Sequence, residues 1–487
     1  MQQAADIAGR RFEPRQVVEI LEHALELLKK LPESERTASE IEILEKLATT
    51  YIALLDDIHT IESYEALAAR AAHDGLIDVE VRALIDMAWP LSWTSSERSL
   101  EALERALRLS AHQEDPNLRA RTRARCFAQR LWQRWNPQDV EEFHNAFAEV
   151  LKADNRRVLI PYLADCGFIS WISSEYREAC RRLIESRAIQ LETIAQDPYS
   201  NSAYLRGQFV LGLNFLFLGE WGEALRETKE LGARLDKDGN YYWGRVMHLQ
   251  WACVHLHAMD FAGVLAICDS VLPLVRDPEL RPAPDHPTPI PSAFRNRLVL
   301  TGSAETALGN YESALEHLLA ARADMDRSAI IFNWFWRMRL ESAFTELWLA
   351  KGDLAQARPQ AERFLAITLE TAEHTWQALA WEVNARVAIA ELDQTRARDC
   401  IAKGLSAMEG FEVPLAAWRV HATAFELYQN SGDRDSADRH LALSRETIIK
   451  LANSLPAEQP LRHTFLSAPM VRNILGSETP RSCAKEA

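Results

Sequence analysis

The stretch that decides the fold reads Leu211-Gly212-Leu213-Asn214-Phe215-Leu216-Phe217-Leu218-Gly219-Glu220-Trp221-Gly222-Glu223-Ala224. It combines a small residue inside a helix, an aromatic residue, a glycine at a turn, and an alanine early in the next helix. A glycine inside a helix costs about 1 kcal/mol relative to alanine, so it suits a position where a second helix crosses closely. The turn glycine can adopt the positive φ that ends a helix. The pattern therefore predicts a helical hairpin.

The same pattern recurs along the chain at intervals of 40 to 45 residues, with one interval of 90. The alanine of the second helix stands at Ala179, Ala224, Ala314, Ala357, Ala397 and Ala437. A weaker copy around Ser174 and Tyr176 lacks the aromatic residue of the first helix. A degenerate copy inside the long interval carries Trp251, His255, Phe261 and Val264. Because such a unit cannot bury its own apolar face, neighbouring units must stack into a solenoid.

This frame resembles the tetratricopeptide repeat, lengthened from the family's usual 34 or so residues to about 40. The resemblance implies an all-α fold, a tetratricopeptide-like α-solenoid of about ten helical hairpins that form a right-handed superhelix. We expect the superhelix to cover residues 1–455. Its first helix shows an apolar stripe with helical spacing over residues 17–28, and further second helices should begin near Ser63, Ser99 and Val140.

Two segments interrupt the repeat. Residues 273–291 hold seven of the twenty prolines, too many for a helix interior, and predict an extended insertion between two hairpins. A docking peptide or interdomain brace is the alternative interpretation of this insertion. Residues 456–475 predict one C-terminal helix that caps the last repeat, and residues 476–487 predict a disordered tail.

The composition narrows the class of protein further. Only 18 glycines in 487 residues disfavour a many-stranded β-structure, and 47% hydrophobic residues disfavour disorder. The net charge of −15 disfavours nucleic acid and anionic membranes as partners. The seven scattered cysteines form no C-x-x-C pair, and no signal peptide is visible, which together favour the cytoplasm.

The sequence offers no sign of catalysis. It contains no G-x-x-x-x-G-K-[ST], G-x-G-x-x-G, H-E-x-x-H or G-x-S-x-G motif, so we expect no catalytic residue, cofactor or metal. His248, His255 and His257 are expected to be packed or hydrogen-bonded, with a metal site as the alternative. The aromatic run Phe332, Trp334, Phe335 and Trp336 is expected to pack between repeats, with a ligand or partner platform as the alternative.

In such a solenoid, fixed positions of each first helix line the concave surface. Counting in the repeat frame predicts these groove residues: Arg206, Phe209, Leu213, Arg339, Glu346, Glu382, Arg386, Arg419 and Glu426. A groove of mixed charged and apolar residues suits a protein or peptide partner, with a small-molecule inducer as a further possibility. The frame also predicts that Gly302→Val destabilises a helix crossing, whereas substitution of Glu382 should barely affect folding.

Several strings resemble the C-terminal repeat domain of bacterial signal-transduction ATPases with numerous domains. They are Arg10-Arg11-Phe12-Glu13-Pro14-Arg15, Leu21-Glu22-His23-Ala24-Leu25-Glu26-Leu27-Leu28, Pro90-Leu91-Ser92-Trp93, Leu100-Glu101-Ala102-Leu103-Glu104-Arg105-Ala106-Leu107 and Leu461-Arg462-His463-Thr464-Phe465-Leu466-Ser467-Ala468.

This resemblance implies a sensor or partner arm that regulates an attached or associated ATPase and its effector. The ATPase and the effector are both missing, so Met1 begins either an excised domain or a free-standing relative. No functional residue can be carried over from the family. A free-standing adaptor that binds a peptide in its groove, and an accessory subunit of an enzyme, are the alternative hypotheses.

Overall fold

The computed structural model describes residues 14–54, 56–152, 156–194, 201–237, 241–276 and 291–477, and across these ranges the secondary structure is helical. Most of the Pro-rich insertion (residues 277–290) and most of the predicted tail (residues 478–487) lie outside the described residues.

The first half of the chain contains α2 (Pro14–Leu28), α3 (Glu33–Ala53), α4 (Asp57–His73), α5 (Ile77–Ser92), α6 (Ser96–Ser110), α7 (Pro116–Gln133), α8 (Pro137–Val150), the 3₁₀ helix η1 (Arg156–Leu159), α9 (Ile160–Ile172), α10 (Tyr176–Ile194), α11 (Asn201–Phe217) and α12 (Trp221–Lys237). The second half contains α13 (Tyr241–His257), α14 (Phe261–Arg276), α15 (Pro291–Ala307), α16 (Tyr311–Arg327), α17 (Asn333–Ala350), α18 (Leu354–Leu369), α19 (His374–Ala390), α20 (Gln394–Ala407), α21 (Pro414–Ser431), α22 (Arg434–Asn453), α23 (Pro460–Ser467) and α24 (Pro469–Gly476).

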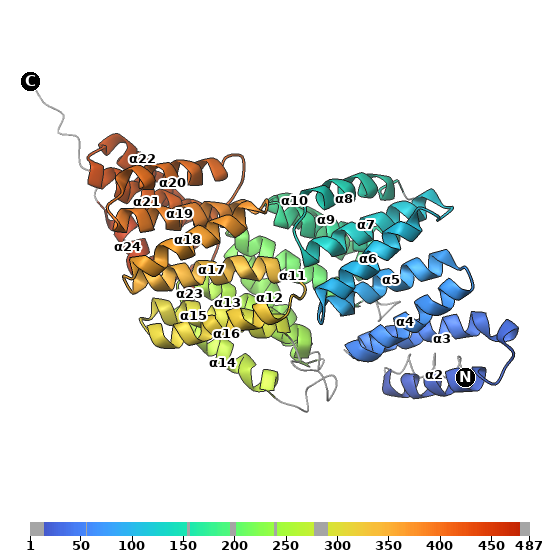
Figure 1. The fold of residues 1–487 in the computed structure, drawn as a ribbon. Coiled ribbons are helices and arrows are strands. Elements are labelled where there is room, and N and C mark those ends of the chain that lie inside the picture. Colours follow the sequence, from blue (N-terminus) through green and yellow to red (C-terminus); the bar gives the residue numbers. More distant parts are fainter. Residues whose placement is uncertain are drawn as a thin grey trace, which may run out of the picture.

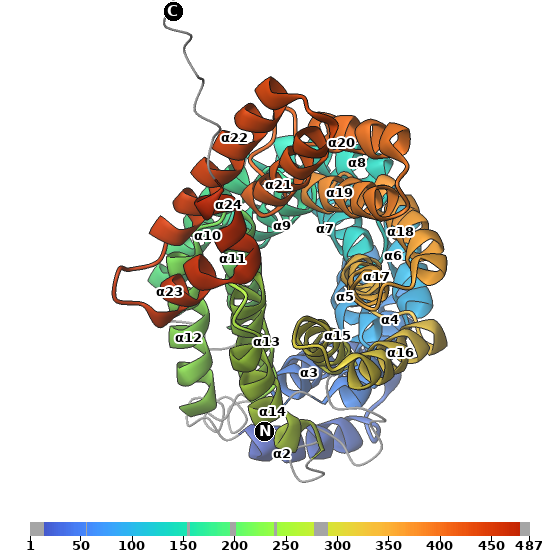
Figure 2. The same ribbon diagram turned by 90° about the vertical axis from the view of Figure 1, so that its left-hand side faces the viewer.

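Consecutive helices pair as ten hairpins within the described ranges, from α3/α4 to α21/α22. The first helix of each hairpin from α5 onward also contacts the first helix of the next hairpin. Figure 2 shows the result: odd-numbered helices such as α13, α15, α17 and α19 line the inside of a ring, and even-numbered helices form its outside. The all-α, tetratricopeptide-like solenoid predicted from the 40-residue pattern is confirmed.

The hairpin turns keep one backbone geometry even where glycine is absent. The predicted turn glycines have positive φ, as at Gly219 (74°) and Gly432 (79°). Ser174, Met259 and Leu392 have φ of 60°, 61° and 62° at the same position of other hairpins. In every case a fully or almost fully buried alanine or valine follows five residues later. The repeat is therefore more regular in its backbone than in its sequence.

Gly302 and Gly212, two of the helix glycines, make room for different neighbours. A Cβ on Gly302 would lie 2.7 Å from Leu318 Cγ, so α15 and α16 do cross closely there, as predicted. A Cβ on Gly212 would instead lie 3.0 Å from Gln250 Oε1, on α13. Gln250 Nε2 donates a hydrogen bond of 2.6 Å to the Phe209 carbonyl oxygen. Gly212 thus makes room for the next hairpin, and its predicted close contact with its own partner helix is corrected.

The C-terminal segment forms two helices, α23 and α24, where the sequence predicted one. Pro469 cannot donate the backbone hydrogen bond of a continuing helix, and it starts α24 instead. Both helices contact α22, and the Phe465 ring lies 4.9 Å from the Trp221 ring and 6.3 Å from the Trp418 ring. Phe465 therefore connects α23 to α12 as well as to α21.

The superhelix completes more than one turn, and its successive turns are in direct contact. Figure 1 shows the N-terminal helices on one side of the molecule and the C-terminal helices on the other. The backbone N–H groups of Ile331 and Phe332 donate to the carbonyl oxygens of Ser92 and Trp132, over 2.7 and 2.8 Å. The His374 N–H donates to Ser174 Oγ over 2.7 Å. These contacts join hairpin tips of the first turn to inter-hairpin loops of the second turn. We call this set of contacts the seam.

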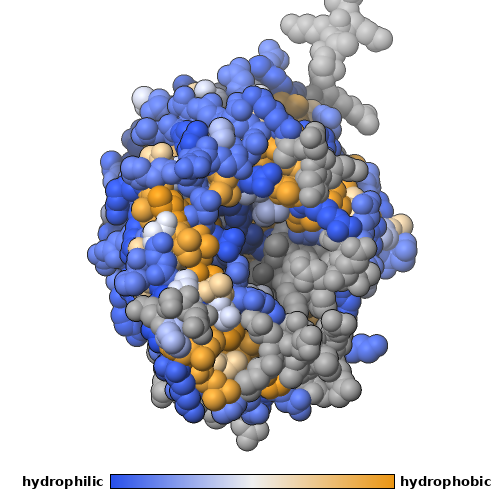
Figure 3. Space-filling view, turned by 90° about the vertical axis from the view of Figure 1, so that its right-hand side faces the viewer, coloured by the Kyte–Doolittle hydropathy of each residue, from blue (hydrophilic) through white to orange (hydrophobic). Residues whose placement is uncertain are grey.

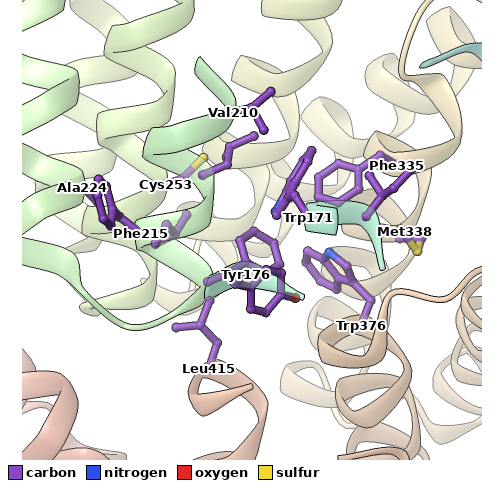
Figure 4. Packing of buried hydrophobic residues seen from close by; sticks show 14 of the residues in the cluster. Trp171, Tyr176, Val210, Phe215, Ala224, Cys253, Phe335, Met338, Trp376 and Leu415 are labelled. Carbon is purple, nitrogen blue, oxygen red and sulfur yellow. The ribbon is translucent and has the colours of Figure 1, made fainter. Parts of the chain in front are cut away.

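Aromatic side chains of both turns pack against one another next to the seam (Figure 4). Trp171 of the first turn lies 4.8 Å from Phe335 of the second turn, between ring centres. Phe217 lies 5.5 Å from Tyr176 and 6.4 Å from Trp376. The aromatic run from Phe332 to Trp336 therefore packs between turns of the superhelix and not only between adjacent repeats.

No helix in the described part of the chain is both long and apolar enough to cross a bilayer. Figure 3 looks onto the end formed by the N-terminal half and shows a hollow at its centre, with hydrophobic side chains on part of the rim.

Candidate functional site

Six of the nine predicted groove residues line two separate cavities. Glu382, Arg386, Arg419 and Glu426 line one cavity at the C-terminal end, which we call the charged pocket. Arg206 and Phe209 line another cavity, which we call the aromatic pocket. The remaining three predicted residues line neither cavity. Glu346 binds the arginines of the charged pocket, Arg339 contacts the wall of the aromatic pocket, and Leu213 is buried in the core and lines neither.

The repeat itself builds the charged pocket. Glu346, Arg386 and Glu426 stand 40 residues apart, so they occupy one position on α17, α19 and α21 and alternate in charge. Arg386 Nη1 donates to the two Glu346 oxygens over 2.8 and 2.9 Å, and Arg419 also donates to Glu346. The ion pairs therefore tie three inner helices together.

These ion pairs also set the protonation of Glu346. Burial acts to raise the pKa of its carboxyl group, but the guanidinium groups of Arg386 and Arg419 oppose burial and hold the pKa well below its usual range. The same pairing raises the pKa of Arg386 against the effect of burial. Glu346 is therefore an anion throughout the neutral range and is a poor general acid.

The environment of Glu382 contradicts the expectation that its substitution would barely affect folding. Its side chain is only 3% exposed and accepts a hydrogen bond of 2.8 Å from Thr423 Oγ1. Its carboxylate oxygens lie 3.8 Å from the guanidinium groups of Arg386 and Arg419. Removing one partner of a buried ionic network is destabilising, because the other charges lose their compensation.

The C-terminal helix α24 forms one wall of the charged pocket, a role that the sequence did not indicate. Met470, Asn473 and Ile474 of α24 face Glu426 and Gln429 of α21 across a cavity of about 320 Å³. Glu426 and Gln429 are exposed. Carboxylate, guanidinium, amide and apolar groups thus line one space.

The aromatic pocket combines residues of both turns in one partly open cavity. Its lining residues are Trp89, Trp93, Trp132, Arg206, Phe209, Val246, Leu249, Ala293, Asn296, Ile331, Phe332 and Trp336. The sequence did not indicate a role for three of these tryptophans, of which Trp89 lies in α5, Trp93 directly follows α5 and Trp132 lies in α7. Trp93, Trp132 and Trp171 recur at intervals of 39 residues, a signal that a search for repeated aromatic residues can find.

The histidines expected to be packed or hydrogen-bonded have such environments. His255 Nδ1 lies 2.7 Å from Asp260 Oδ2, and its ring meets that of Trp251 edge-on at 5.4 Å. Burial, together with Arg339 and Arg419, lowers the pKa of His257 to about 3. The described residues contain no group of three or more His, Cys, Asp or Glu side chains arranged to hold a metal ion.

Comparisons with known proteins place the fold. No family model matches the chain, and no curated protein matches it. Among solved structures, it is similar to a Rap protein complexed with competence and sporulation factor, with a TM-score of 0.54 and 13% identity over 77% of this chain and 99% of the Rap chain.

It also matches a chain of the APC/C hetero-tetramer Cut9–Hcn1 (TM-score 0.45, 12% identity, 97% and 94% of the two chains) and yeast Tom70 (TM-score 0.37, 11% identity, 98% of each). The similarity to the Rap structure shows the fold: this chain is a tetratricopeptide-like all-helical repeat protein.

Proposed function

We propose that the chain is a non-catalytic recognition module that binds a protein or peptide partner in the charged pocket. The observation that carries this proposal is that four groove residues counted from the repeat, Glu382, Arg386, Arg419 and Glu426, line one cavity with α24. The Rap structure of the same fold was solved in complex with competence and sporulation factor, which supports a binding role for such a superhelix.

The chemistry of the pocket fits a peptide. Exposed amides of Gln429 and Asn473 can pair with peptide backbone groups, while Met470 and Ile474 offer apolar contacts. The carboxylate of Glu426 is exposed beside the pocket and favours a basic side chain in the partner. Glu346, Arg386 and Arg419 are already engaged with one another, so they hold the shape of the pocket and are unsuited to proton transfer.

We further propose that partner binding regulates an attached or associated signalling ATPase in the cytoplasm. The strings that resemble the repeat domain of signal-transduction ATPases support this proposal, and six buried cysteines without disulfides fit a reducing compartment. A P-loop ATPase encoded in the same reading frame or in the neighbouring gene should change its rate of ATP hydrolysis when the partner peptide is added. If no such ATPase is encoded there, the free-standing adaptor, which uses the same pocket, becomes the better hypothesis.

A peptide library displayed on phage and selected against the full chain tests the binding role. We expect Glu426→Lys to weaken binding of the selected peptides about tenfold, which corresponds to about 1.4 kcal/mol, because it reverses an exposed charge at the pocket. Glu446→Lys makes the same change at an exposed position of the outer helix α22 and should leave binding unchanged. A library that yields no binding peptide, or peptides that tolerate Glu426→Lys as well as Glu446→Lys, would overturn the proposal.

A further inference from the structure

The walls of the aromatic pocket present ring faces and edges from two turns of the superhelix. Trp89 meets Trp93 and Trp132 edge-on, at 5.8 and 5.6 Å between ring centres. Phe332 lies 5.2 Å from Trp132 and 5.5 Å from Trp336. Aromatic walls of this kind hold planar apolar groups by stacked and edge-to-face contacts.

Arg206 brings a positive charge into this apolar cavity. It is 8% exposed, and its guanidinium carbon lies 4.6 Å from the centre of the Trp89 ring. The acid in its vicinity, Asp165, is engaged in an ion pair with Arg125. Within the described residues, no side-chain or backbone oxygen accepts a hydrogen bond from Arg206. Buried charges in proteins are ordinarily paired, so this guanidinium lacks the anion that its environment calls for.

The protonation of Arg206 does not remove this charge. Burial, together with the nearby Arg125, lowers its pKa to about 10, and Asp165 opposes both effects. At neutral pH the guanidinium therefore remains a cation inside an aromatic cavity.

A second buried arginine adds to the positive potential. Arg339 is 3% exposed and lies 5.4 Å from the Trp336 ring. Its Nη1 group donates to Cys253 Sγ over 2.7 Å and to Asn296 Oδ1 over 3.4 Å, and its Nη2 group finds no acceptor among the described residues. The lining of the pocket contains no Asp or Glu. Both guanidinium groups thus lack a carboxylate partner among the residues that the structure describes.

We propose that the aromatic pocket binds a small planar molecule that carries one anionic group, with Arg206 as the partner of the anion. Carboxylate, sulfonate and phosphate oxygens all match the two-pronged geometry of a guanidinium. The aromatic or heteroaromatic body of the ligand lies against Trp89 and Trp132, and Asn296 offers a polar contact at the wall. This inference goes beyond the proposed peptide binding, because the two cavities share no lining residue.

Such a ligand would contact both turns of the superhelix at once. Trp89 and Trp132 belong to the first turn, whereas Phe332 and Trp336 belong to the second and lie next to the seam. A molecule that binds the assembled pocket and not the separated turns stabilises their association. Ligand binding should therefore raise the melting temperature of the full chain.

Two dyes that differ in one charged group test the inference. The anion 8-anilinonaphthalene-1-sulfonate should bind the full chain at a single saturable site, at least tenfold more tightly than neutral N-phenyl-1-naphthylamine. Arg206→Met should weaken binding of the sulfonate dye at least tenfold and leave the Kd of the neutral dye within twofold. Arg358→Met, at an exposed arginine of α18, should change neither. The carboxylate 1-naphthoate should displace the sulfonate dye and raise the melting temperature, whereas neutral 1-naphthamide should do neither.

The wild-type competition needs no variant, so it decides the matter even where Arg206→Met fails to fold. Equal competition by 1-naphthoate and 1-naphthamide would overturn the role of the anion. Ala293→Phe fills the cavity and should abolish binding of both dyes. Undiminished dye binding by a folded Ala293→Phe variant would show that the dyes bind elsewhere and would overturn the site. None of these readouts involves the charged pocket, so a failure here leaves the peptide proposal standing.

Discussion

At the scale of single residues, the left-handed turn position is the most informative feature of the repeat. Ser174, Met259 and Leu392 adopt a conformation that costs a residue with a Cβ roughly 1–2 kcal/mol. Leu392 is also 83% exposed, so its side chain contributes little packing in return. The strain is tolerated because the hairpin on either side determines the path of the chain.

We expect Leu392→Gly to raise the free energy of unfolding by about 1 kcal/mol, because the relief of strain exceeds the entropy that glycine adds to the unfolded chain. Urea unfolding of the full chain measures the shift. Leu319→Gly makes the same change at an exposed position inside α16 and should lower stability by a similar amount. A loss of stability in both variants would contradict the assignment of strain to Leu392.

Glycine alone therefore reveals only part of the repeat. The sequence shows the turn at Gly219 or Gly432, but it conceals the same turn at Met259 and Leu392, since neither residue type signals a positive φ. Counting five residues back from a buried alanine or valine locates all of these turns. That rule became visible only when the backbone angles were known.

At the scale of helices, close crossings explain why glycine persists inside α15. A Cβ on Gly302 would lie 2.7 Å from two carbon atoms of Leu318 and 3.2 Å from the Ala314 carbonyl oxygen. Leu318 is fully buried, so it has no free space into which to move.

Gly302→Val should therefore lower the free energy of unfolding by on the order of 2–3 kcal/mol, through overpacking at the α15/α16 crossing. Thermal unfolding followed by circular dichroism measures the loss. Ser303→Val places the same side chain at the next position of α15, which is only partly buried, and should cost less than half as much. Equal losses for the two variants would show that helix propensity, and not the crossing, sets the cost.

Helices and their pairing were predictable from the sequence because the period is local. The shared 40-residue spacing of Glu346, Arg386 and Glu426 likewise predicted one position on successive inner helices, and Arg386 and Glu426 line the charged pocket. Other features were not predictable. Gly212 faces α13 and not its own partner helix, and the wall that α24 contributes depends on how the chain folds back after Pro469. The aromatic pocket combines residues of two turns, which the pattern of one repeat cannot reveal.

At the scale of the whole molecule, the seam contains a buried carboxyl group whose protonation affects stability. Glu373 is fully buried at the start of α19 and accepts a hydrogen bond of 2.7 Å from the Trp376 N–H group. Tyr176 and Ser174 of the first turn also donate to it. Burial raises the pKa of Glu373 to about 7, although these hydrogen bonds oppose the rise.

The folded state therefore binds the Glu373 proton more tightly than the unfolded state, whose pKa is near 4.5. The contribution to stability is complete below pH 4.5 and is lost as the pH rises through 7. We expect the neutral variant Glu373→Gln to lose this pH dependence and to exceed the wild type at pH 8 by up to ~3 kcal/mol. Melting temperatures of both proteins between pH 5 and 8.5 measure the effect.

Glu412→Gln is the matched control, because Glu412 also lies at the seam. Its pKa is lowered to about 2, first by the hydrogen bond from Arg177 and further by Lys450, against the effect of burial. This variant should bring no gain in stability at pH 8. A Glu373→Gln variant that follows the pH profile of the wild type would contradict the account of the seam.

The seam also limits how the number of repeats in such a chain can change. Solenoid proteins commonly gain or lose whole repeats, because each repeat contacts only its neighbours. Here the tip of α9/α10 binds the start of α19 with four hairpins, α11/α12 to α17/α18, between them. Deleting one of these hairpins would bring a different loop opposite Ser174 and would also separate Trp221 from Ser454. The number of repeats between paired loops is thus locked, and a relative of this protein can vary freely in repeat number only beyond the paired loops, as at its N-terminal end.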